Sequence, residues 1–122
     1  MKLKISLIGL VAALFCAGAA NASTMRVIVV ETSDVAGYVK ALEQGKAVLK
    51  ARGSPAQLRV WRATFAGDAA GSVVVSIEYP DFTALAKDTA LFRSDAELRT
   101  WLRGLDKLRK ITSDSVYEEL KP

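Results

Sequence analysis

Arg62 and Glu78 are the charged side chains whose positions most favour chemistry. They fall in two segments with the alternating pattern of β-strands, 57–65 and 72–79, joined by a turn at 66–71. On the predicted hairpin they share one face with Thr64 and Ser76. This arrangement favours two interpretations. The pair orients a ligand in a partly dry cavity, or it is an exposed cross-strand ion pair worth well under ~1 kcal/mol.

The two faces of this hairpin differ in composition. One face is strongly apolar, and we expect it to pack under helices. Its residues are Trp61, Ala63, Phe65, Val73, Val75, Ile77 and Tyr79. The other face is half polar and is the candidate ligand-binding face. Its residues are Val60, Arg62, Thr64, Val74, Ser76 and Glu78. A half-polar face also suits plain solvent exposure, because antiparallel sheets often have one wet side.

The amino-acid types exclude several kinds of active site. The chain has no histidine, and its one cysteine is Cys16. Once Cys16 is removed with the leader described below, disulfides, thiolate nucleophiles, Ser-His-Asp triads and haem held by His or Cys are all excluded. We therefore expect neither a metal nor a cofactor. Any general base has to be a carboxylate with a raised pKa, or an unperturbed group aided by water, and Glu78 is the nominee.

The first 22 residues have the form of a secretory signal peptide. Lys2 and Lys4 precede an apolar run at 5–17, and the segment ends in Ala20-Asn-Ala22. The run is shorter than the roughly 20 residues that span a bilayer. We expect cleavage after Ala22, a periplasmic or secreted protein, and no stable membrane anchor afterwards. The alternative, lipid attachment at Cys16, is disfavoured by the bulky Phe15 before it.

The remaining residues, 23–122, predict one ordinary domain. The whole chain has 17 Lys and Arg against 13 Asp and Glu, and loss of Lys2 and Lys4 leaves 15 against 13. So small a surplus is not the charge pattern of a nucleic-acid-binding protein, so we expect no nucleic-acid partner. About 100 residues are enough for a single core without disulfides.

The order of predicted elements is β-α-β-β-α-β. A strand at 25–31 is followed by an amphipathic helix at 34–51, the hairpin, a short helix from 81 to about 90, a further helical segment and a last strand at 111–120. Ser94-Asp-Ala-Glu97 has the form of a capping box. Behind it Leu98, Trp101, Leu102, Leu105 and Leu108 form an apolar stripe, in which we expect Trp101 to be buried. This order predicts an α+β, ferredoxin-like antiparallel sheet with helices on one face.

Several local patterns in this order resemble the dimeric α+β barrel superfamily, which includes NIPSNAP-like proteins and cofactor-free antibiotic-biosynthesis-type monooxygenases. The similarity is carried by Val60-Trp-Arg-Ala-Thr-Phe65, the turn from Gly67 to Gly71, Val73-Val-Val-Ser-Ile-Glu-Tyr79, Asp81-Phe-Thr-Ala-Leu-Ala86 and Leu91-Phe-Arg-Ser-Asp-Ala-Glu97. The resemblance implies a homodimer in which two sheets meet around a cavity. The catalytic residues of these oxygenases often include histidine, so none is transferred to this chain.

These observations leave three functions open. The first is an exported homodimeric binding or structural module with a cavity for a small organic ligand. The alternative is a cofactor-free monooxygenase or isomerase that acts on an electron-rich organic substrate. The third is an envelope-associated protein without a small ligand.

Overall fold

The computed structural model describes residues 22–121, which form a four-stranded sheet and three α-helices. The elements are β1 (Thr24–Glu31), α2 (Val35–Ala51), β2 (Gln57–Arg62), the short 3-10 helix η1 (Gly67–Ala69), β3 (Val73–Tyr79), α3 (Phe82–Ser94), α4 (Ala96–Asp106) and β4 (Lys110–Glu118). The predicted order of strands and helices is confirmed. The second helical region consists of two helices, α3 and α4, that meet at Asp95.

The sheet is antiparallel throughout and has the strand order β2-β3-β1-β4. The two central strands, β1 and β3, carry most of the β-branched residues. The pairing of β1 with β4 is irregular between Val29 and Val30, where the register shifts. The α+β, ferredoxin-like arrangement predicted from the sequence is therefore present.

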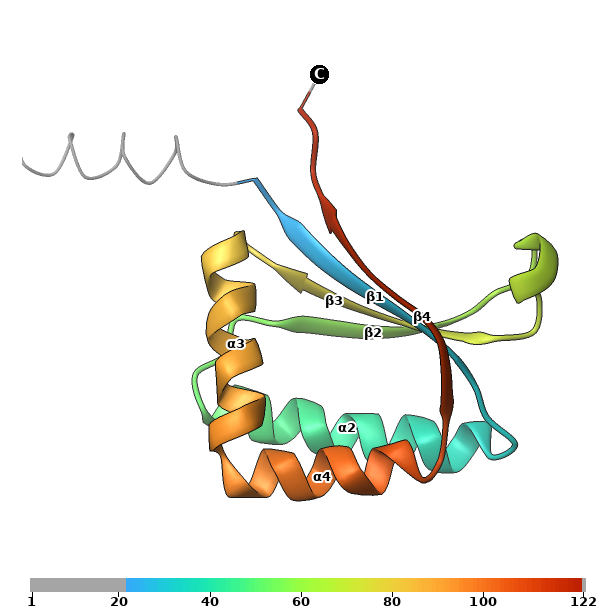
Figure 1. Cartoon of the computed structure of the whole chain (residues 1–122), viewed down its shortest axis with the longest axis horizontal. Coiled ribbons are helices and arrows are strands. Elements are labelled where there is room, and N and C mark those ends of the chain that lie inside the picture. Colours follow the sequence, from blue (N-terminus) through green and yellow to red (C-terminus); the bar gives the residue numbers. More distant parts are fainter. Residues whose placement is uncertain (1–21, 122) are drawn as a thin grey trace, which may run out of the picture.

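All three helices lie on one side of the sheet, and no helix covers the other side in the described part of the chain (Figure 1). In Figure 1, α2 and α4 run side by side, and α3 crosses from the level of the sheet to the start of α4. The buried apolar side chains come from the helices and from the strand face beneath them. They include Ile28, Val30, Tyr38, Leu42, Leu58, Val73, Val75, Ile77, Tyr79, Leu85 and Leu105.

Each of the three α-helices begins at an aspartate whose side chain accepts a backbone N–H. Asp34 caps α2 through Gly37, Asp81 caps α3 through Ala84, and Asp95 caps α4 through Leu98. The predicted capping box at Ser94 is wrong, because Ser94 is the last residue of α3. The carboxylate one residue later takes the cap, and the intended partner Glu97 instead pairs with Arg52 at 2.8 Å.

The predicted faces of the hairpin are wrong for β2. Residues that pair directly across an antiparallel ladder share a face, and Trp61 pairs with Val74. Trp61 is 52% exposed on the uncovered side, where its indole N–H donates to Ser76 Oγ at 2.8 Å. Leu58 and Val60 instead contribute to the core beneath the helices. Each of the two faces of this strand carries a large apolar residue, Leu58 on one and Trp61 on the other. The alternation alone therefore could not show which face points inward.

The expected signal peptide falls on residues 1–22, nearly all of them outside the described residues. Within residues 22–121, no helix has the length and apolar character needed to cross a membrane. The β1 strand begins at Thr24, two residues after the expected cleavage site. Ser23 is already tied to the sheet, since its carbonyl accepts the Glu119 N–H at 2.8 Å.

Candidate functional site

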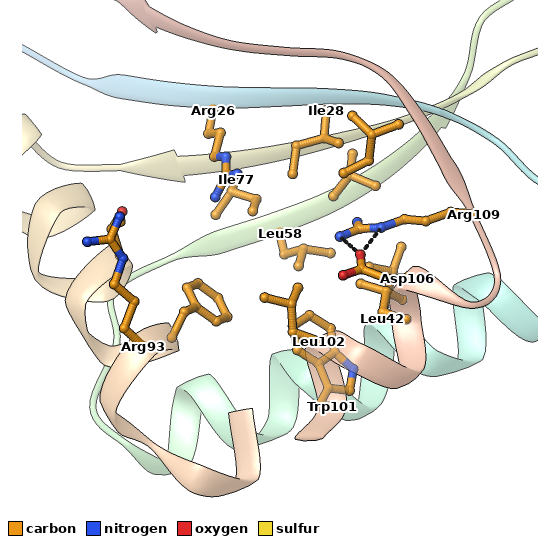
Figure 2. Close-up of a pocket in the computed structure, with 15 residues that line it drawn as sticks. Arg26, Ile28, Leu42, Leu58, Ile77, Arg93, Trp101, Leu102, Asp106 and Arg109 are labelled. Carbon is orange, nitrogen blue, oxygen red and sulfur yellow. Dashed lines mark hydrogen bonds and ion pairs between the residues drawn. The ribbon is translucent and has the colours of Figure 1, made fainter. Parts of the chain in front are cut away.

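A partly enclosed cavity of about 290 Å³ lies between the sheet and the helices (Figure 2). Its sheet wall comes from all four strands, with Ile111 as the contribution of β4, and its helix wall comes from α2, α3 and α4. Most of its surface is apolar. The apolar lining residues are Ile28, Leu42, Leu58, Val75, Ile77, Phe92, Trp101, Leu102, Leu105 and Ile111. Clefts of this character are the usual binding places for small molecules.

An aromatic pair forms part of the helix wall. Phe92 at the end of α3 and Trp101 in α4 stack with their ring centroids 6.2 Å apart and their planes 24° apart. The Trp101 indole N–H donates to the carbonyl of Ala41 in α2 at 2.7 Å. Gly45, one turn later in α2, has no side chain, and a Cβ there would overlap the Trp101 ring. The glycine therefore allows α2 and α4 to approach and fixes where the indole lies.

Four charged side chains line the cavity: Arg26, Arg93, Arg109 and Asp106. Arg109 is 5% exposed and binds Asp106 at 3.0 Å, while its guanidinium also donates to the Tyr38 hydroxyl at 3.1 Å. The tyrosine is fully buried, so this contact anchors Arg109 to the core. The pair occupies one end of the cavity (Figure 2).

Arg26 reaches into the cavity from β1 and is paired with Asp114 of the neighbouring strand β4. The two side chains form a bidentate contact, with distances of 2.9 and 2.6 Å. The hydrogen bond from Arg26 holds the pKa of Asp114 below its usual value, and the same contact raises the pKa of Arg26. The arginine is thereby fixed as a cation at the cavity wall.

The four residues predicted from sequence as a ligand-binding face do not form one face. Ser76 and Glu78 lie on the uncovered side of the sheet, on the same side as Trp61. Arg62 pairs with Val73, so it lies on the opposite side from Glu78, and Thr64 lies beyond the end of β2. Both interpretations of an Arg62–Glu78 pair are therefore wrong. None of the four residues lines the cavity between sheet and helices.

The uncovered side of the sheet is apolar along its middle. Met25, Val27 and Val29 of β1 and Val74 of β3 are all partly exposed there. The two outer strands contribute the exposed side chains of Trp61 and Tyr117. We call these six residues the open face.

A second polar cluster is centred on Asp88, in the middle of α3. Asp88 is 3% exposed and accepts a hydrogen bond from Ser54 Oγ at 2.5 Å. Burial, together with the negative charge of Asp88, raises the pKa of Tyr79, so its hydroxyl stays protonated. The cluster joins α3 to β3 and to the loop before β2, and its hydrogen bonds are satisfied within the fold.

The side chains of the cavity suit binding more than proton transfer. Glu78 cannot serve as a base there, because it lies on the other side of the sheet. Asp106 is the only carboxylate among the described lining residues, and it already accepts hydrogen bonds from the Arg109 guanidinium. Within residues 22–121, no three His, Cys, Asp or Glu side chains come together as a metal site.

The sequence contained a partial signal for this cavity. The apolar stripe of α4 and the motif Leu91-Phe-Arg93 were both visible, and Trp101 was expected to be buried within that stripe. Trp101 is partly buried, and one side of it lines the cavity. The contributions of Arg26 and Arg109 were not predicted, because they depend on how β1 and the start of β4 are placed over the helices.

Solved structures with this fold are similar over most of their length. A NIPSNAP family protein from Agrobacterium tumefaciens aligns with a TM-score of 0.60 and 13% identity over 83% of this chain and 92% of that one. SnoaB, a cofactor-independent oxygenase from Streptomyces nogalater, aligns with a TM-score of 0.58 and 11% identity over 84% and 95%. A NIPSNAP-like domain protein from Burkholderia xenovorans aligns with a TM-score of 0.59 and 13% identity over 83% and 84%.

No family model and no curated protein sequence matches the chain. The structural likeness therefore concerns the fold, at identities far too low to transfer an activity. At that level it agrees with the pattern of strands and turns in the sequence. The chain has the same fold as these two NIPSNAP-like proteins and this cofactor-independent oxygenase.

Proposed function

We propose that this protein is an exported homodimer that binds a small, mainly apolar organic molecule in the cavity between its sheet and its helices. The observation that carries the proposal is the cavity of about 290 Å³, with ten apolar side chains in its wall. This volume lies at the lower end of the range of ligand pockets. A ligand of one or two rings fits it best.

The fixed position of the aromatic wall supports binding by a preformed site. Trp101 is held by its hydrogen bond to Ala41, by its stacking on Phe92 and by the close approach of Gly45. A site whose walls are already ordered loses little conformational entropy on binding.

The open face supports the homodimer. A sheet that is covered by helices on one side normally presents polar residues on the other. Here the middle of that side is apolar, and Val74 lies at its centre between Trp61 and Val29. A second copy of the same sheet would cover this surface, and the resemblance to dimeric α+β barrels points the same way.

Export is proposed from the first 22 residues of the sequence. The start of β1 at Thr24 is compatible with cleavage after Ala22, since the cut would leave every strand complete. N-terminal sequencing of protein isolated from the cell envelope should give Ser23. An intact Met1 or a lipid-modified Cys16 would contradict the proposal.

Native mass spectrometry of the purified protein tests binding and assembly together. We expect the mass of a dimer, with one small organic molecule per chain when the protein is isolated gently from cells. Adding 2-naphthylmethanol to ligand-free protein should produce a complex with one probe per chain. A monomer would overturn the dimer, and absence of any complex at millimolar probe would overturn the binding function.

A cofactor-free oxygenase is the second candidate. It is supported by the structural similarity to SnoaB and by an apolar cavity that would exclude water from an easily deprotonated ring. Oxygen uptake with hydroxynaphthalenes should then exceed the uncatalysed rate and fall in Asp106→Asn, which removes the carboxylate of the lining. Uptake equal to the protein-free rate would reject this candidate.

A further inference from the structure

The charges around the cavity do not balance. Three arginines line it, against the single carboxylate of Asp106. Asp106 pairs with Arg109, and Asp114 pairs with Arg26. Among residues 22–121, none of the ion pairs involves Arg93. One guanidinium at the cavity is therefore free to pair with an anion from outside the chain.

Arg93 is well placed to meet a bound molecule. It lies in the last turn of α3, directly after Phe92, which forms part of the aromatic wall. Its side chain is exposed, and in Figure 2 its guanidinium lies on the same side of the cavity as that of Arg26, away from the Arg109–Asp106 pair. A ring stacked among Phe92, Trp101 and Leu102 can thus keep a charged substituent at the solvent-accessible end.

We infer that the cavity selects small aromatic carboxylates, with Arg93 pairing with the carboxylate and the Phe92–Trp101 wall holding the ring. This inference rests on the binding function proposed above and adds the chemical class of the ligand. An arginine suits this task because its planar N–H groups match the two oxygens of a carboxylate.

Two probes of equal size separate ring binding from anion recognition. The probes are 2-naphthoate and the neutral 2-naphthylmethanol, titrated calorimetrically into the purified protein at low salt. We expect 2-naphthoate to bind about tenfold more tightly, as one charge-assisted contact at a partly exposed site would produce. The preference should shrink as salt is added, because ions screen the pair.

Arg93→Gln should remove the preference while leaving affinity for 2-naphthylmethanol nearly unchanged, and Arg93→Lys should retain part of it. The matched control is Arg103→Gln, which removes an exposed arginine from the last turn of α4 that does not line the cavity. It should keep the full preference. Because both arginines are exposed, thermal melts should show all three variants folded.

The outcomes distinguish the preference for carboxylates from the binding function itself. Equal binding of both probes to the unmodified protein overturns the carboxylate class but leaves the binding function standing. A preference that survives in Arg93→Gln overturns the role of Arg93. If neither probe binds, the proposed binding function is overturned, and this inference with it.

Discussion

The two sides of the sheet carry similar β-branched residues, which are buried on the side under the helices and partly exposed on the other. On β1, Ile28 and Val30 point under the helices and are buried, whereas Val27 and Val29 point to the open face and are partly exposed. On β3, Val75 and Val74 show the same contrast. One side is covered by a helical layer, and the other carries the six apolar residues of the open face without a partner among the described residues.

The difference shows why the cavity lies where it does. In the helical layer, α2 and α4 are held together by Trp101, and α3 crosses from the sheet to the start of α4 at one end. Side chains of Phe92, Leu102 and Ile111 fill only part of the space enclosed in this way. Within residues 22–121 no second layer covers the open face, so we expect this face to serve assembly.

Trp101→Ala should have the largest effect of the variants proposed here. It removes a large side chain packed on Gly45 and Phe92 and the hydrogen bond to Ala41, so the free energy of unfolding should fall by about 3–5 kcal/mol. Urea denaturation measures this loss. A decrease below about 1 kcal/mol would show that α4 does not depend on this contact.

Val74→Asp tests the open face. It would place a desolvated, unpaired charge from each chain in the proposed interface, weakening association by roughly 3 kcal/mol or more. Sedimentation velocity should show a dimer for the unmodified protein at micromolar concentration and a monomer for the variant. Thr83→Asp, which adds the same charge to exposed α3, should remain dimeric.

The sedimentation result for Val74→Asp is interpreted against the oligomeric state of the unmodified protein. If it is a monomer, the dimer is rejected. If it is a dimer and Val74→Asp stays fully dimeric, the interface lies elsewhere and the open face needs another explanation.

Gly45→Ala tests how closely the helical layer is packed. The added methyl group would overlap the Trp101 ring, so the ring must move, and we expect a net loss of about 1–2 kcal/mol despite the better helix propensity of alanine. Gly104→Ala is the matched control in α4, where nothing lies near the added methyl. It should stabilise the protein slightly, and equal effects of the two changes in urea melts would contradict the packing described here.

Asp114→Asn should have the smallest effect and depends on pH. The pKa of Asp114 is lowered in the folded state, so its contribution is present above the ordinary pKa of 3.8 and is lost as pH falls through the folded value. Because both partners are about one-third exposed, the variant should lose less than about 1 kcal/mol at pH 7. The two proteins should converge in stability as the pH falls below the folded-state pKa of Asp114. A difference that stays constant with pH would show that Asp114 acts otherwise than by its charge.

The sequence predicted the order of elements well because that order depends on local signals. Asp34 before an amphipathic segment and the break at 53–55 were enough to place α2. The inward face of β2 depends on its register against β3, which local alternation cannot specify when Leu58 and Trp61 compete. The cavity could be predicted only in part for the same reason, since Arg26 and Arg109 are brought to its wall only in the assembled fold.

The chain's two tryptophans offer the most direct test, because one lies on each side of the sheet. Each gives one indole N–H signal in a ¹⁵N-correlated NMR spectrum, from Trp101 at the cavity and from Trp61 on the open face. Titration with 2-naphthylmethanol should shift the Trp101 signal and leave the Trp61 signal in place. A shift of Trp61 alone, or of neither, would contradict ligand binding between the sheet and the helices.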